Sequence, residues 1–175
     1  MSQQVLSDEN ESQLQVLGQI NEIFSSLNIN FWLRGGWAID FLLGRITRPH
    51  EDIDIVAWVQ HREEIEQTLI QQDFDYVRVS DFQSNFFKSD VEISFVFLTL
   101  TNDGRIYANG FSEWIWRSDA LPAEPFTLNG VSSFVLSPYQ LLENLQVYEQ
   151  GTGRKLRPKD FQSIETLQNI IGVNN

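Results

Sequence analysis

The chain has 175 residues, of which 42% are hydrophobic and 13% aromatic, a composition typical of one globular domain and unlike a disordered segment. It contains no cysteine, which excludes disulfides, thiol nucleophiles and thiolate metal sites. The formal net charge of −12 argues against binding to nucleic acids or anionic membranes and favours cationic partners.

Residues 1–11 are polar and acidic and show no targeting signal. No stretch approaches the roughly 20 apolar residues that a membrane span requires. We therefore expect a cytoplasmic protein without a membrane partner.

The first elements alternate between helix and strand. Hydrophobic spacing predicts a helix over 12–27 and a short buried strand over 29–33. Gly35 and Gly36 follow and lead into an apolar helix over 37–43. This order places the glycine pair at a strand-to-helix turn.

A polar connection precedes the next strand, which alternating residue types predict over 52–58. Its isoleucines would face the core, and Asp52 and Asp54 would face away. A helix over 61–71 follows. Three of its apolar residues are predicted to point inward: Ile65, Leu69 and Ile70.

The second half of the chain is rich in strands. Strands are predicted over 74–79, 85–88, 90–100 and 105–108, the last two joined by a turn at 102–104. An irregular, tryptophan-rich segment spans 109–125, and a hairpin over 126–136 turns at Asn129 and Gly130. The remaining predictions are a helix over 137–150, a flexible basic loop over 151–157 and a last helix over 158–171.

These elements predict an α/β protein of the α+β type, with a mixed β-sheet packed by helices. We expect one domain over 1–136. Residues 137–175 are expected to form a helical segment packed on that same domain.

The glycine pair is the first feature that can carry chemistry. Glycine lets the backbone come close to a ligand, and the free N–H groups at the start of a helix favour an anion such as phosphate. The alternative is a tight turn that binds nothing.

The second feature is the pair of aspartates on one strand face. Strand geometry sets Asp52 and Asp54 roughly 7 Å apart, where two ionised carboxylates repel each other. A divalent cation is the usual compensation, and Mg²⁺ with substrate phosphates fits best because it needs few protein ligands. The alternative is the solvent face of an antiparallel strand.

The third feature is the polar face predicted for the strand over 90–100. Alternation puts Asp90, Glu92 and Ser94 on one side, opposite apolar residues. An acid beside a metal pair can complete the metal site or take a proton from a hydroxyl. The alternative is a polar sheet face without a ligand.

Two residues just before the strand over 52–58 each have a structural and a functional interpretation. His50 either makes a structural hydrogen bond or reaches a phosphate. Arg48 either joins a charge network with Asp40 and Arg45 or contacts phosphate directly.

The order of these motifs resembles a known family. Segment 33–40 reads LRGGWAID, and it is followed by Gly44-Arg45, Thr47-Arg48, His50 and the run DIDI at 52–55. This pattern resembles the signature of small antibiotic nucleotidyltransferases in the polymerase-beta superfamily. It is most similar to the aminoglycoside 2''-adenylyltransferase-like group, which also includes lincosamide nucleotidyltransferases. The strong match covers about residues 31–58, and a weaker one continues to the segment 157–160.

The resemblance implies a nucleotidyltransferase fold with short C-terminal helices, and it implies roles for single residues. Gly35 and Gly36 would hold a nucleoside triphosphate, and Asp52 and Asp54 would bind Mg²⁺. Glu92 matches a third carboxylate that serves as metal ligand and general base.

Two further matches leave alternatives open. The relatives more often have aspartate where this chain has Glu92, so Asp90 is the alternative base. Lys159 resembles a lysine that approaches the nucleotide phosphates, and the alternative is a solvated basic loop that it shares with Lys155 and Arg157.

The expected function is Mg²⁺-dependent transfer of a nucleoside monophosphate, from ATP or another nucleoside triphosphate, to a hydroxyl of a small molecule. An acidic chain is compatible with a cationic acceptor such as an aminoglycoside. Trp114 and Trp116 either line the acceptor pocket or belong to the core. The alternatives are a lincosamide or metabolite as acceptor, and a non-catalytic nucleotide-binding or antitoxin-like module. The sequence assigns no oligomeric state.

Overall fold

The computed structural model describes residues 7–147 and 155–174. The helices within these ranges are α1 (Asp8–Leu27), α2 (Gly35–Leu43), the short 3-10 helix η1 (Val59–His61), α3 (Arg62–Gln71), α4 (Pro138–Gln146) and α6 (Pro158–Asn174). The strands are β1 (Trp32–Arg34), β2 (Ile53–Trp58), β3 (Asp75–Arg78), β4 (Gln83–Lys88), β5 (Val91–Leu100), β6 (Ile106–Ala108), β7 (Pro125–Leu128) and β8 (Val131–Val135).

The strands form one mixed sheet in the order β3-β4-β5-β2-β1-β8-β7, with β6 paired to β5. β2 runs parallel to β5, and β1 runs parallel to β8. The remaining neighbours are antiparallel. The mixed sheet predicted from the sequence is therefore confirmed.

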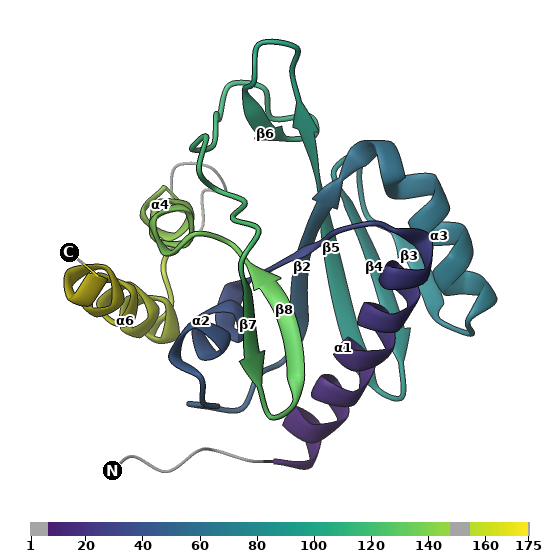
Figure 1. Ribbon diagram of the computed structural model, residues 1–175, viewed down its shortest axis with the longest axis horizontal. Coiled ribbons are helices and arrows are strands. Elements are labelled where there is room, and N and C mark those ends of the chain that lie inside the picture. The colour runs from purple at the N-terminus through teal and green to yellow at the C-terminus, as the bar shows by residue number, and fades with distance from the viewer. Residues whose placement is uncertain (1–6, 148–154, 175) are drawn as a thin grey trace.

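Helices cover both sides of this sheet. Figure 1 shows α1 and α3 on one side and α2, α4 and α6 on the other. α4 and α6 pack against each other, and α6 also contacts α2. Within the described part of the chain, no helix combines the length and the apolar character needed to cross a membrane.

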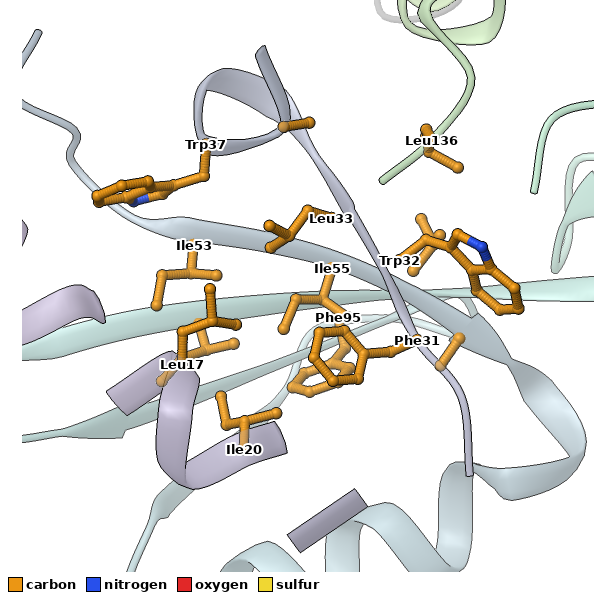
Figure 2. Packing of buried hydrophobic residues seen from close by; sticks show 14 of the residues in the cluster. Leu17, Ile20, Phe31, Trp32, Leu33, Trp37, Ile53, Ile55, Phe95 and Leu136 are labelled. Atoms are coloured by element: carbon orange, nitrogen blue, oxygen red, sulfur yellow. The ribbon is translucent and has the colours of Figure 1, made fainter. Parts of the chain in front are cut away.

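The main core lies between α1 and the centre of the sheet. Leu17 and Ile20 of α1 point toward Ile53, Ile55 and Phe95 on the neighbouring strands β2 and β5 (Figure 2). These side chains are almost completely buried, and each contributes roughly 1.5–3 kcal/mol of burial free energy. Because Ile53 and Ile55 of β2 point into this core, the alternating residues Asp52 and Asp54 face the opposite side of the sheet.

Several turns follow from residue type as predicted. Gly44 ends α2 in the left-handed conformation, with φ at 76°. Asn129 and Gly130, with φ at 47° and 81°, connect β7 and β8. Ser137 caps α4 by accepting a hydrogen bond from the Tyr139 N–H.

Other boundaries differ from the prediction. α1 begins at Asp8 and not at residue 12, because the Ser7 hydroxyl caps it by accepting from the Asn10 N–H at 3.1 Å. Ile70 was predicted to point inward, but it is 47% exposed. Consecutive helical residues lie about 100° apart, so Leu69 faces the core with Ile65 and Ile70 turns away. Residues 148–150 of the predicted helix and 151–154 of the predicted loop lie outside the described residues.

Candidate functional site

The glycine pair sits where β1 passes into α2, and both glycines have close neighbours. Gly35 has a φ of +72°, and a Cβ on it would lie 2.6 Å from Asp54 Oδ2. A Cβ on Gly36 would overlap Arg48 Nη2 and lie 2.7 Å from His50 Nδ1. Close approach of these side chains to the backbone therefore requires glycine at both positions.

Pairing of β2 with β5 brings the predicted acids together. In this parallel register Asp54 is the partner of Ser94 and Ile53 of Ile93, and continuing the register by one residue puts Asp52 opposite Glu92. Burial, together with the charges of Asp54 and Glu92, raises the pKa of Asp52 from 3.8 to about 6, although Arg34 and Lys159 act to lower it. We call Asp52, Asp54 and Glu92 the acid cluster.

The two candidate bases have different positions. Glu92 lies within β5, is half-buried and accepts a 3.4 Å hydrogen bond from Asn85 Nδ2. Asp90 was predicted to share this strand face, but it lies in the exposed turn before β5, with a φ of +64°. The turn takes Asp90 out of the strand alternation, so the structure brings Glu92 and not Asp90 to the acid cluster.

A cavity of about 240 Å³ joins the glycine turn to the acid pair. Its wall includes Arg34, Arg48, His50, Lys159 and residues of α4 and α6. A larger cavity of about 1100 Å³ adjoins it at Gly36, but neither Asp52 nor Asp54 lines it. The smaller cavity is lined by Asp52 and Asp54, and its five cationic or imidazole side chains, which include Arg157, suit an anionic ligand.

His50 is held by a buried carboxylate. Its Nε2 lies 2.6 Å from Asp40 Oδ2, and Thr47 donates to the same carboxylate through its hydroxyl and its backbone N–H. Of the two interpretations offered for His50, the structural hydrogen bond is therefore present, while Nδ1 faces Gly36. No ion pair of Asp40 with Arg45 or Arg48 occurs among the described residues.

Two polar residues of α1 that the sequence reasoning missed also hold this segment. Asn10 accepts from the His50 N–H at 3.0 Å and donates to the Arg48 carbonyl. Gln13 donates to the His50 carbonyl at 2.8 Å and accepts from Trp37 Nε1 at 2.6 Å. Both are buried. We call the hydrogen-bonded set Asp40, Thr47, His50, Asn10 and Gln13 the His50 network.

The remaining predicted residues are placed as follows. Lys159 lies in the first turn of α6, lines the smaller cavity and pairs with Glu51 at 3.7 Å. Trp116 is buried and bridges to Ile106, which is a core position. Trp114 is half-buried, and neither tryptophan lines the two cavities described above.

The carboxylates of the acid cluster are also candidate ligands of a cation. Within the described ranges, no group of three or more His, Asp or Glu side chains forms a metal site by itself. Asp52 and Asp54 nevertheless fit Mg²⁺, which one or two carboxylates bind together with substrate phosphates. Burial and repulsion from Asp54 and Glu92 raise the pKa of Asp52, and a bound cation would offset both effects on its charged form.

Comparisons with known proteins identify a family and a fold. The family model described as aminoglycoside-2''-adenylyltransferase matches residues 16–167. A 2''-aminoglycoside nucleotidyltransferase of Klebsiella pneumoniae is 35% identical over 71 residues, which are 37% of this chain and 40% of that protein. The chain thus aligns with less than half the length of this curated relative.

Two solved structures have a similar fold. The crystal structure of ANT(2'')-Ia in complex with adenylyl-2''-tobramycin gives a TM-score of 0.78 at 19% identity, covering 93% of this chain and 91% of that one. The lincomycin-bound lincosamide antibiotic adenylyltransferase LnuA gives 0.68 at 21% identity, covering 96% and 99%. The nucleotidyltransferase fold predicted from the sequence is confirmed.

Proposed function

We propose that this chain, which belongs to the aminoglycoside-2''-adenylyltransferase family, transfers a nucleoside monophosphate from a nucleoside triphosphate to a hydroxyl of a small molecule. The observation that carries the proposal is the acid cluster beside the glycine turn. Burial and the charges of the neighbouring carboxylates raise the pKa of Asp52 to about 6, and cationic side chains line the cavity that holds Asp52 and Asp54. An acid cluster that served only to stabilise the fold would not bring like charges together, because their repulsion destabilises the folded state.

The nucleotide would bind through its phosphates. Asp52 and Asp54 would hold Mg²⁺, which supplies neutralisation of the triphosphate charge. Gly35 and Gly36 line this cavity at the start of α2, where free N–H groups would favour phosphate oxygens. Arg48 and Lys159, which line the cavity, add positive charge.

Glu92 would act as the general base. It takes the proton of the acceptor hydroxyl while that oxygen forms a bond to the α-phosphorus. The bond between the α-phosphorus and the bridging oxygen breaks, and pyrophosphate leaves. Holding both reactants in line accounts for much of the expected rate.

The expected donor is ATP, and the expected acceptor is an aminoglycoside-type molecule, as the family description indicates. The net charge of −12 would attract a polycation to the protein. Lincosamides belong in the acceptor panel because the lincomycin-bound relative has the same fold.

The test is a reaction of the chain with Mg²⁺, ATP and a panel of aminoglycosides, lincosamides and simple aminocyclitols. We expect pyrophosphate release and an equal amount of an acceptor whose mass has grown by one nucleoside monophosphate. Tight binding of Mg²⁺ and ATP without either product, for every acceptor, would favour a nucleotide-binding module instead.

Two matched variants test the base. Glu92→Gln keeps the size of the side chain and should lower the transfer rate about 10²- to 10⁴-fold, because it cannot take the proton. Asp90→Asn removes the same charge from the neighbouring turn and should leave the rate within about twofold, since surface substitutions have small effects. The reverse result would assign the base to Asp90.

A further inference from the structure

We propose that Arg34 is a phosphate-contacting residue that makes the binding of the divalent cation and of the nucleotide depend on each other. The inference rests on the proposed function and adds to it a residue that the sequence reasoning did not select. Arg34 is the last residue of β1 and immediately precedes the glycine turn.

Strand pairing places Arg34 beside the carboxylate pair. In the antiparallel register of β1 and β2, Arg34 is the partner of Asp54. Its Nη2 lies 3.8 Å from Asp54 Oδ1, too long for a hydrogen bond but close enough for an ion pair. Its charge also lowers the pKa of Asp52. Arg34 therefore acts on both aspartates.

The guanidinium of Arg34 has unused hydrogen-bonding capacity. Its Nε is buried and has no hydrogen-bond partner in the described part of the chain. The side chain is 33% exposed and lines the smaller cavity together with Gly35 and Gly36. A guanidinium carries five N–H donors in a fixed plane that matches phosphate oxygens. An anionic group in this cavity would satisfy those donors.

The charges then predict opposite effects on two ligands. Arg34 and a divalent cation compete for Asp54 and repel each other, so Arg34 weakens binding of the cation alone. A triphosphate between them is attracted to both and removes the repulsion. Arg34 should therefore weaken bare-metal binding and strengthen binding of the metal with the nucleotide, which is a coupling between two ligands.

The experiment uses two titrations of the full chain. Binding of Mn²⁺ alone is followed by electron paramagnetic resonance of the free ion, and binding of α,β-methylene ATP with Mg²⁺ is followed by calorimetry. Arg34→Gln should bind Mn²⁺ about tenfold more tightly and the nucleotide analogue about tenfold more weakly than wild type.

Arg78→Gln is the matched control. It removes the same charge from an exposed ion pair on β3, which β4 and β5 separate from β2. Both affinities should stay within about twofold of wild type.

Arg34→Lys separates charge from shape. It retains the positive charge, so its Mn²⁺ affinity should stay near wild type, while its analogue affinity falls because one ammonium replaces the planar donor set. If Arg34→Gln has a much lower thermal midpoint than wild type, Arg34→Lys still tests the role of Arg34.

The outcomes separate this inference from the proposed function. Equal affinities in wild type and Arg34→Gln, or two shifts of the same sign, would overturn the role of Arg34 while leaving the nucleotide site intact. A folded wild-type chain that binds no Mg²⁺ and nucleotide analogue would contradict the proposed function itself.

Discussion

Two polar clusters meet at the start of α2, and they differ in how their charges are satisfied. In the His50 network the Asp40 carboxylate receives hydrogen bonds from Thr47 and contacts His50 Nε2, all in buried surroundings. In the acid cluster, burial and the like charges of Asp54 and Glu92 raise the pKa of Asp52. The first arrangement contributes to folding, whereas the second opposes folding and needs a functional explanation.

The largest expected effect is on catalysis, from the acid cluster. Asp54→Asn should lower nucleotidyl transfer at least about 10²-fold, because a carboxylate for Mg²⁺ is lost. The thermal midpoint without metal should change little, because the variant loses repulsion from Asp52 and also attraction to Arg34. Pyrophosphate release and a melting curve on the same preparation check both statements. Retained turnover would separate Asp54 from the metal site.

The next effect is on stability, from the His50 network. Asp40→Asn replaces a buried acceptor of several hydrogen bonds, and we expect a loss of about 2–3 kcal/mol in the free energy of unfolding. Thr47→Val removes one of those donors and should cost about 1 kcal/mol. Urea unfolding measures both losses. If Asp40→Asn costs less than Thr47→Val, the network is not what stabilises this loop.

A smaller effect is expected where the two clusters meet. Gly36→Ala brings a methyl group against Arg48 and the imidazole of His50. We expect the free energy of unfolding to fall by about 1–3 kcal/mol and nucleotide binding to weaken. Gly18→Ala, in α1, has open space around the new methyl group, and its free energy of unfolding should rise by about 0.5–1 kcal/mol. Unfolding and calorimetry on both variants provide the check, and effects of the same sign would contradict the close packing at Gly36.

The smallest effect concerns pH. Because the pKa of Asp52 in the folded chain is about 6 and its ordinary value is 3.8, the folded state holds this proton more tightly than the unfolded state. The carboxyl therefore does not lower the free energy of unfolding at low pH. Its destabilising effect grows as the pH rises from 3.8 to about 6. After allowance for solvent screening, the full cost is about 1 kcal/mol.

Comparison with Asp52→Asn isolates this contribution from the other carboxylates. The variant should be equal to wild type in stability at low pH and more stable by that amount above the pKa of Asp52. Urea unfolding at a series of pH values measures the difference. A difference that does not change with pH would mean that Asp52 is not destabilised by its neighbours.

Much of the site was predictable because its signals are local. The glycine turn depends on two adjacent residues, and the alternation around Ile53 fixes which way Asp52 and Asp54 face. Glu92 shares a face with Ser94 by the same period of two. These features follow from backbone geometry and need no knowledge of distant contacts.

The rest depended on contacts that sequence spacing does not show. Asn10 belonged to the polar segment 1–11 and Gln13 was a polar residue of the predicted first helix, yet α1 places both beside the segment around His50, about forty residues away in the chain. Arg34 looked like an ordinary residue before the glycines until the pairing of β1 with β2 put it beside Asp54. Asp90 was misplaced because a turn of positive φ replaces the first step of the predicted strand.

The most direct test of the account compares wild type and Asp52→Asn by unfolding, with and without ligand, above the pKa of Asp52. Without ligand the variant should be the more stable protein, since it has no charged carboxylate that is partly buried beside Asp54 and Glu92. With Mg²⁺ and α,β-methylene ATP at about one hundred times the dissociation constant, wild type should gain about 2.7 kcal/mol and become the more stable one. A variant that gains as much as wild type would contradict the claim that the acid cluster holds the metal and nucleotide.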